Sequence, residues 1–172
     1  MYYLTNQDVR KLEKHANDIR QSIIEMLVAA GSGHTAGPLD MADIFALLYF
    51  SVLKHDPKNP NWEERDRVVL SAGHICPVLY ATMAHAGYFP VEELATLRKL
   101  GSRLQGHPHR TALPGVENSS GPLGSGLSQA VGMALAERMD NPYTSKFIYC
   151  IAGDGELNEG QIWEAAMLAG KE

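Results

Sequence analysis

An aspartate between two glycines follows an apolar stretch late in the sequence. The run KFIYCIA occupies residues 146–152, and Gly153, Asp154 and Gly155 come directly after it. Glycines let a backbone approach a ligand closely, a following helix offers free N–H groups, and an ionised aspartate is a ligand that suits Mg²⁺ or Ca²⁺. Because ligands of parallel α/β sheets bind beyond the carboxyl ends of strands, the segment predicts a diphosphate site bridged by a cation. A plain Asp-Gly turn is the competing interpretation.

Three of the seven histidines share a second pattern, since each follows a glycine in an expected loop. They are His34, His74 and His107. Imidazoles titrate near neutral pH, so they can donate hydrogen bonds to a phosphate or move protons to and from hydroxyls and carbonyls. Their separations of forty and thirty-three residues match no short zinc signature. Three unrelated surface histidines remain the alternative, because spacing alone does not show that the side chains meet.

A second glycine-rich segment opens a helix. Residues 119–134 read SSGPLGSGLSQAVGMA, which matches neither the GxGxxG fingerprint nor a phosphate-binding loop with its lysine. Its backbone could still cradle a ligand, and close packing of the helix against its neighbours is the alternative. The segment overlaps the end of a long Gly- and Pro-rich stretch, residues 101–124, and loops of that length in compact domains are often functional.

The elements that would position these residues alternate between helical and strand patterns. A capping box at Thr5 and Asp8 predicts a helix that stops at Gly31, and Pro38 can begin the next helix. Strands are expected at residues 67–71 and 146–152, and further helices at residues 39–54, 77–88, 91–101, 125–139 and 161–170. This order predicts α/β architecture with a parallel sheet, of which only two strands are evident.

The overall composition excludes several classes of protein. The 172 residues suffice for one globular domain, and a formal net charge of −5 without a basic run argues against nucleic acid or anionic lipid as the main partner. No apolar run approaches the ~20 residues of a membrane span, and no secretory signal precedes the first helix, so we expect a cytoplasmic protein. Cys76 and Cys150 are far apart, which favours two unpaired thiols in a reducing compartment.

Four motifs in one order make the sequence similar to a known family. They are SGHTAGPLDMADI, RDRVVLSAGHICPVLYATMAHAGY, GHPHRTALPGVENSSGPLGSGLSQAVGMALAE and GDGELNEGQIWEAA. Together they resemble the diphosphate-binding N-terminal domain of transketolases, which depend on thiamine diphosphate (thiamine pyrophosphate). The match runs from about residue 10 onward and looks most like the N-terminal subunit of split-chain bacterial or archaeal transketolases. The loop GHTAGP departs from the commoner Gly-His-Pro-Gly-Ala-Pro form.

The resemblance implies a set of cofactor-binding residues. In such enzymes the aspartate of the GDG triplet ligates the cation on the cofactor diphosphate, which here is Asp154. Gly155 would contact the diphosphate through its backbone N–H, and His74 through its imidazole. Gly121 and Leu123, in the GPLG loop, would lie against the cofactor. Thiamine diphosphate with Mg²⁺, or Ca²⁺ in its place, is therefore the expected cofactor.

The resemblance also implies an activity and its substrates. The family moves a two-carbon ketol unit between sugar phosphates in the pentose phosphate pathway of carbohydrate metabolism. His34 and His107 would face the substrate, bind its hydroxyls and assist proton transfers. Glu159 resembles a glutamate at the dimer interface that couples paired active sites. A 1-deoxyxylulose-5-phosphate synthase-like enzyme and a non-catalytic binding module that keeps the cofactor fold are the alternatives.

The family pattern extends beyond these residues. Its second cation ligand, an asparagine, comes from a strand after the final helix, and the glutamate that activates the cofactor belongs to a separate pyrimidine-binding domain. We therefore expect residues 1–172 to form a single incomplete diphosphate-binding domain, inactive alone, whose partner is a C-terminal transketolase subunit. We also expect an exposed apolar surface that favours association between copies of the chain, lined by Val69, Leu70, Ile148 and Ile151.

Overall fold

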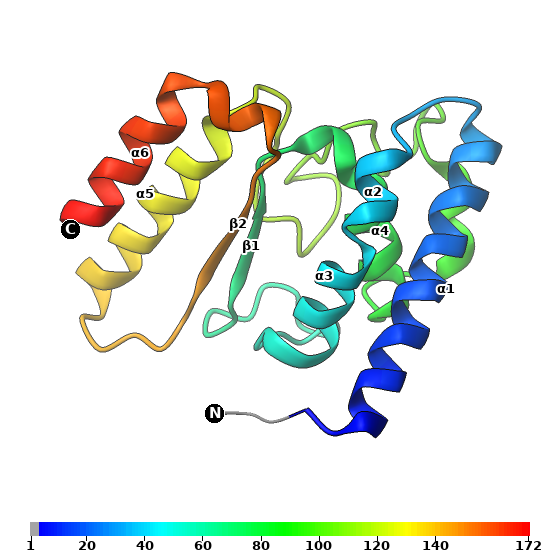
Figure 1. Cartoon of the computed structure of the whole chain (residues 1–172), viewed down its shortest axis with the longest axis horizontal. Coiled ribbons are helices and arrows are strands. Elements are labelled where there is room, and N and C mark those ends of the chain that lie inside the picture. The colour runs from blue at the N-terminus through cyan, green and yellow to red at the C-terminus, as the bar shows by residue number, and fades with distance from the viewer. Residues whose placement is uncertain (1–3) are drawn as a thin grey trace.

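The first helix begins and ends as its sequence predicts. The computed structural model describes residues 4–172, and α1 spans Asn6–Ala30 (Figure 1). The Thr5 hydroxyl accepts a hydrogen bond from the Asp8 N–H at 3.2 Å, and the Asp8 carboxylate accepts one from the Thr5 N–H at 3.1 Å, which completes the capping box. Gly31 ends the helix in the left-handed region, with φ of 64°.

The segment after α1 departs from the single helix that its sequence predicts. It forms α2 (Ala36–Asp40), α3 (Ala42–Leu47) and a π-helical turn, Leu48–Val52. Arg20 on α1 explains the break, because its Nε donates to the Leu39 carbonyl at 3.2 Å. That carbonyl would otherwise accept the N–H of Asp43, four residues on, whose carboxylate Arg20 also pairs with.

A second prediction is wrong for residues 91–101. Only a 3₁₀ helix, Val91–Thr96, forms there. The chain then leaves the helical region, since Leu97 is extended with ψ of 128° and Arg98 is left-handed with φ of 61°. The Arg98 N–H donates to the Leu104 carbonyl at 2.9 Å, so the backbone doubles back toward the long loop.

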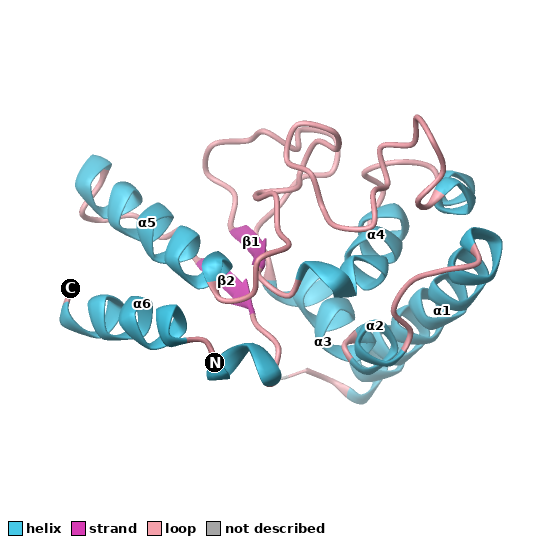
Figure 2. Cartoon of the chain, turned by 90° about the horizontal axis from the view of Figure 1, so that it is seen from above, coloured by secondary structure: helices cyan, strands magenta, loops and turns pink. Residues whose placement is uncertain are grey.

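Two parallel strands lie between two layers of helices, which confirms the α/β prediction. The strands are β1 (Arg67–Leu70) and β2 (Ile148–Ile151), paired from Arg67 with Ile148 to Leu70 with Ile151. Figures 1 and 2 show α1, α3 and α4 (Cys76–His85) on one face, and α5 (Ser125–Asp140) and α6 (Gly160–Lys171) on the other. Two short 3₁₀ helices, Gly73–Ile75 and Gly155–Asn158, follow the two strands.

The two strands differ in burial, which corrects the expected apolar surface. Val69 and Leu70 on β1 are 0% and 1% exposed, because helices cover both faces of this strand. Ile148 and Ile151 on β2 are partly exposed, so only this half of the expected surface is open. On the α5 and α6 side a hollow of about 260 Å³ reaches Ile148 and Cys150.

The long loop of residues 101–124 is anchored to β1 by polar side chains. Asn118 accepts a hydrogen bond from the Leu70 N–H at 3.2 Å and donates one to the Leu70 carbonyl at 3.3 Å. The buried carboxylate of Glu117 receives two hydrogen bonds from Arg65, at 2.9 and 3.0 Å, and one from Arg67 at 3.1 Å. These bonds tie a loop without regular secondary structure to β1 and to the residues just before it.

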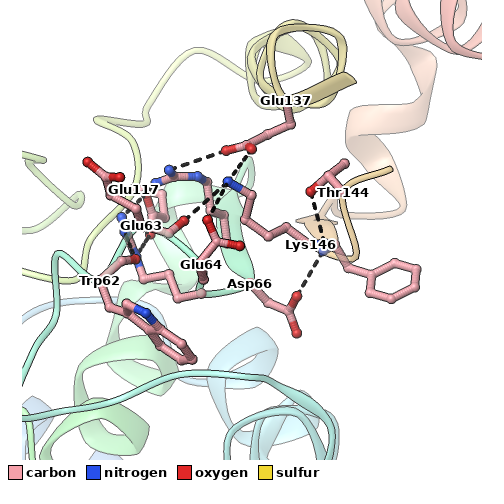
Figure 3. Close-up of polar contacts among 11 residues, drawn as sticks. Trp62, Glu63, Glu64, Asp66, Glu117, Glu137, Thr144 and Lys146 are labelled. Atoms are coloured by element: carbon pink, nitrogen blue, oxygen red, sulfur yellow. Dashed lines mark hydrogen bonds and ion pairs between the residues drawn. The ribbon is translucent and has the colours of Figure 1, made fainter. Parts of the chain in front are cut away.

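The same ion-pair cluster extends to the other helical layer. Arg67 contacts Glu137 of α5 at 3.5 Å, and Lys146 pairs with the second oxygen of Glu137. Figure 3 shows Lys146 between Glu137 and the carbonyl of Glu63, with Glu117 close by. The cluster therefore joins the loop, the start of β1 and α5.

None of the helices within residues 4–172 is both long and apolar enough to cross a membrane.

Candidate functional site

The ends of the two strands bring two predicted segments together. β1 leads into Ser71 and Ala72, and β2 leads toward Gly153. The N–H groups of Ser71 and Ala72 both donate to the Ile151 carbonyl, at 2.9 and 3.3 Å. A Cβ placed on Gly153 would lie 3.7 Å from the Cβ of Ala72. The segment after β1, which carries His74, thus lies next to the GDG turn at the carboxyl edge of the sheet.

Three histidines from separate loops converge at this edge. The rings of His34 and His74 lie 5.0 Å apart between centroids. His107 lies beside them, since a Cβ on Gly73 would come within 2.9 Å of its Cδ2 atom and 2.6 Å of the Ser120 hydroxyl oxygen. Gly73 is therefore required for the close approach of the long loop. The sequence left this convergence open, and the fold supplies it.

Side chains that no sequence motif connects with the site hold the backbone before His107 in place. The Cys76 thiol donates to the Gly106 carbonyl at 3.2 Å, and the Tyr80 hydroxyl donates to the Gln105 carbonyl at 2.9 Å. Both donors project from α4, so a helix fixes the backbone just before His107. The guanidinium of Arg98 lies against Gly106, 3.2 Å from the place of a Cβ. A small recess shared by His34, His74 and Arg98 completes this corner.

The electrostatic setting favours a neutral His107. Partial burial lowers the pKa of His107 below its ordinary value, and the nearby His74, His34 and Arg98 lower it further. Its imidazole is accordingly a proton acceptor at neutral pH. Within residues 4–172 no three His, Cys, Asp or Glu side chains gather to hold a metal ion.

The GDG turn presents an open backbone and a carboxylate. Asp154 and Gly155 are exposed, and a Cβ on Gly155 would meet no atom within 4 Å. A 3₁₀ helix, Gly155–Asn158, begins within this turn. The turn follows β2, as the sequence predicts, and the binding roles of Asp154 and Gly155 stay predictions.

The GPLG loop lies next to His107 and is tied to α6. A Cβ on Gly121 would be 3.9 Å from His107 Cδ2, which places the loop against the histidines. The Leu123 carbonyl accepts a hydrogen bond from Gln161 Nε2 at 2.8 Å. The Ser120 hydroxyl oxygen is buried, and no residue within the described part of the chain bonds to it. A buried hydroxyl in this position is available to a ligand.

Other candidates lie at the margin of this edge or away from it. Glu159 is exposed just before α6, and its Cβ would be 3.0 Å from a Cβ on Gly124. His15 stacks on Phe50 with ring centroids 3.8 Å apart, and His85 bonds to the Ser22 hydroxyl at 2.9 Å. These two histidines therefore contact other side chains of the helical layer.

The groups at the edge fit a diphosphate cofactor. An exposed carboxylate at Asp154, the open backbone of Gly155 and Gly121, and the unpartnered Ser120 hydroxyl offer cation coordination and hydrogen bonds. Imidazole donors from three loops stand beside them. Within residues 4–172, Asp154 belongs to no group of three or more His, Cys, Asp or Glu side chains that could hold a cation.

Comparisons with known proteins identify the family. Residues 12–172 match the model of the transketolase thiamine diphosphate-binding domain. The chain is 51% identical over 160 residues to the 6-deoxy-6-sulfo-D-fructose transketolase subunit SqwG of Clostridium sp. (strain MSTE9), covering 92% of this chain and 57% of that protein. It is 45% identical over 164 residues to transketolase of Buchnera aphidicola subsp. Acyrthosiphon pisum (strain APS), covering 90% of this chain and 25% of that protein.

The fold matches as well as the sequence. The structure of transketolase from Leishmania mexicana superposes with a TM-score of 0.86 at 40% identity, over 92% of this chain and 25% of that one. The chain thus spans a little over half of the Clostridium subunit and about a quarter of the longer transketolases. The chain belongs to the family of transketolase thiamine diphosphate-binding domains.

Proposed function

We propose that this chain is the diphosphate-binding part of a transketolase, which moves a two-carbon ketol unit between ketose and aldose phosphates. The observation that carries the proposal is the convergence of His34, His74 and His107 at the carboxyl edge of the sheet, beside the GDG turn. A pure binding module has little use for several imidazoles that face a substrate. Their proximity therefore favours catalysis.

The cofactor-binding roles follow from the open groups at this edge. Asp154 would coordinate Mg²⁺, or Ca²⁺ in its place, on the diphosphate, and the Gly155 N–H and His74 would bind its oxygens. Gly121 and Leu123 would lie along the cofactor, since their loop borders His107. When bound, thiamine diphosphate supplies the electron sink that carbon–carbon bond cleavage requires.

The substrate-facing roles fall to two histidines. The lowered pKa of His107 keeps its imidazole neutral near pH 7, so it can accept a proton from a sugar hydroxyl. His34, whose ring lies 5.0 Å from that of His74, would bind a neighbouring hydroxyl. The protein groups thus orient the sugar and transfer protons, while the cofactor carries the change in bonding.

The remaining parts of the enzyme would come from further polypeptide. The relatives are longer than this chain, and we propose a C-terminal transketolase subunit with the pyrimidine-binding domain as the partner. That assembly would supply a second cation ligand and would place Glu159 at a subunit interface. Self-association of the chain, a cytoplasmic location and a place in the pentose phosphate pathway belong to the same proposal.

A sulfonated ketose is a second candidate substrate. The relative that is 51% identical is named for 6-deoxy-6-sulfo-D-fructose, in which a sulfonate stands where fructose 6-phosphate has a phosphate ester. Both groups are anionic and lie at the far end of the ketose from the cleaved bond. The described edge of the sheet would contact the cofactor end of either ketose, so the two donors must be distinguished by assay.

A coupled ketol-transfer assay on the assembled enzyme tests the proposal. Xylulose 5-phosphate, fructose 6-phosphate and 6-deoxy-6-sulfofructose serve as donors with an aldose phosphate acceptor, and pyruvate tests the synthase alternative. We expect turnover with a ketose, none with pyruvate and none from residues 1–172 alone. His107→Ala should lower kcat at least about 100-fold, whereas His109→Ala, an exposed neighbour, should change it little. An unchanged rate in His107→Ala would support a non-catalytic module.

A further inference from the structure

A buried carboxylate lies under the two glycine-rich turns of the site. Glu156 follows the GDG triplet directly, in the 3₁₀ helix Gly155–Asn158, and is 2% exposed. Its neighbours in sequence, Gly155 and Leu157, are exposed, so the chain turns this one side chain inward. Burial of an ionised carboxylate is costly unless hydrogen bonds replace its water. The partners of Glu156 therefore show what the burial achieves.

Those partners come from three separate segments. One carboxylate oxygen accepts hydrogen bonds from the Ser71 hydroxyl, just after β1, and from the Gly124 N–H at 2.5 Å. The other oxygen accepts from the Gly153 N–H at 2.9 Å. Ser71 in turn accepts from the Gly126 N–H at 3.1 Å. The loop after β1, the GPLG turn and the GDG turn are thereby joined through one side chain.

The charge of Glu156 is balanced by N–H and O–H donors. None of the ion pairs in residues 4–172 includes it. Gly124 is the N-cap of the 16-residue helix α5, whose first N–H groups carry partial positive charge. Hydrogen bonds to an ionised acceptor are about twice as strong as neutral ones, so the negative charge itself matters for the link.

The contact is also sterically specific. A Cβ on Gly126 would lie 2.4 Å from the Cβ and 2.5 Å from the hydroxyl oxygen of Ser71. Gly124 has φ of 87°, and a Cβ there would lie 2.7 Å from Gln161. Glycines at both positions let the start of α5 descend onto Ser71 and Glu156. The two turns are held at a fixed separation by this arrangement.

We propose that Glu156 is a positioning residue that locks the GPLG turn to the GDG turn and so sets the affinity for the cofactor diphosphate. It acts through Gly124 and Gly153 and does not itself contact the cofactor. This inference rests on the proposed function, because the diphosphate is the ligand that the two turns would share.

The variants separate the effect of the negative charge of Glu156 from the effect of its side-chain length. Glu156→Gln keeps the shape but replaces one acceptor oxygen with an NH₂ group, which opposes the N–H of Gly153 or of Gly124. Ser71→Ala removes one donor and leaves the carboxylate in place. Glu156→Asp keeps the charge on a shorter side chain. Glu13→Gln, exposed on α1, is the control for loss of one negative charge.

The assembled enzyme is titrated with thiamine diphosphate at fixed Mg²⁺, and backbone amide exchange is measured in parallel. We expect Glu156→Gln to raise the dissociation constant of thiamine diphosphate about tenfold, as the loss of one charged hydrogen bond predicts, with kcat near wild type at saturating cofactor. The amides of Gly124 and Gly153 should exchange faster, while those of α1 and α4 stay unchanged. Glu156→Asp should recover part of the affinity.

The outcomes also separate this proposal from the proposed function. If wild-type enzyme binds thiamine diphosphate and neither Glu156→Gln nor Ser71→Ala weakens binding, the positioning role is wrong while the function stands. If Glu156→Gln does not fold, Ser71→Ala still decides, since it must raise the dissociation constant and speed exchange at Gly126. A wild-type complex that binds no thiamine diphosphate would overturn both proposals.

Discussion

The two helical layers on either side of the sheet are packed very differently. On the side of α1, α3 and α4, Ile23 and Phe45 are 0% exposed and lie within one continuous apolar core. On the side of α5 and α6, Trp163 is 59% and Met167 73% exposed, and the hollow beside β2 stays open. Figure 2 shows α5 and α6 as a pair on one flank of the strands, with α1, α3 and α4 on the other.

The two layers also support different groups of the candidate site. His34, His74 and His107 are held by the packed layer, through α4 and the loops beside it. The carboxylate of Asp154 and the GPLG loop belong to segments that lead into α5 and α6. The packed layer thus supports the two substrate-facing histidines, His34 and His107, and also His74, while the other groups that would bind the diphosphate rest on the open layer. Glu156 and the Glu117 cluster connect the two.

Truncation of one large side chain in each layer tests the contrast most strongly. Phe45→Ala should lower the free energy of unfolding by about 3–5 kcal/mol, because it opens a cavity in a closed core. Trp163→Ala should lower it by less than about 1 kcal/mol, since the ring is largely solvated and donates one hydrogen bond to the Leu157 carbonyl. Urea unfolding of the chain measures both values, and equal losses would contradict the contrast.

The ion-pair cluster that joins the layers gives the next largest effect. Glu117→Gln should destabilise the chain by about 3 kcal/mol, because it leaves Arg65 and Arg67 near a buried position without their carboxylate. Glu64→Gln is the matched control, with a side chain 58% exposed and 3.8 Å from Lys146, and should cost less than about 0.5 kcal/mol. The same urea unfolding experiment measures both variants. If Glu117→Gln left the free energy of unfolding unchanged, the ion-pair cluster would not stabilise the contact between the layers.

One cysteine lies on each side of this contrast, since Cys76 begins α4 in the packed layer and Cys150 on β2 lines the open hollow. Burial raises the pKa of Cys76 to about 12, and burial together with nearby Glu156 raises the pKa of Cys150 to about 11. Both thiols should therefore react slowly at neutral pH. Cys150, at the open hollow, should be labelled by a disulfide reagent roughly tenfold faster than Cys76, which is 1% exposed. Single-cysteine variants followed by mass spectrometry check this, and faster labelling of Cys76 would reverse the comparison.

The smallest effect concerns protonation of His107. Because the pKa of His107 is lowered in the folded state, the unfolded chain binds more protons than the folded chain. The free energy of unfolding should therefore fall as the pH falls below the ordinary histidine pKa near 6.5. Arg98→Met removes a neighbouring positive charge and should raise the pKa of His107, which burial still keeps below its ordinary value. Arg10→Met, exposed on α1, should leave it unchanged. Nuclear magnetic resonance titration of the His107 imidazole measures its pKa in each variant. A lower pKa in Arg98→Met than in wild type would contradict the predicted increase.

Local signals predict much of the fold. The capping box at Thr5, the stop at Gly31 and the apolar runs of the two strands identify α1, β1 and β2, because each depends on neighbours in sequence. The break at Met41 escaped prediction, since it depends on Arg20 from another helix. The 3₁₀ helix after Pro90 was not predicted either, because the sequence there has the apolar pattern of a longer helix.

The candidate site shows the same limit. His34, His74 and His107 were identified by their preceding glycines, but their convergence follows from strand pairing and from the anchoring of the long loop. Glu156 looks like one more acidic residue in a polar turn, and nothing local marks it as buried. Its three partners lie 3, 32 and 85 residues away in the sequence.

Direct cofactor binding tests the central claim that this edge of the sheet holds a metal-bound diphosphate. The assembled enzyme is titrated with thiamine diphosphate at fixed Mg²⁺ by calorimetry, for wild type, Asp154→Ala and the exposed control Asp140→Ala. We predict that Asp154→Ala weakens binding at least about tenfold, through loss of a cation ligand, while Asp140→Ala binds like wild type. Equal affinity in wild type and Asp154→Ala would contradict the account.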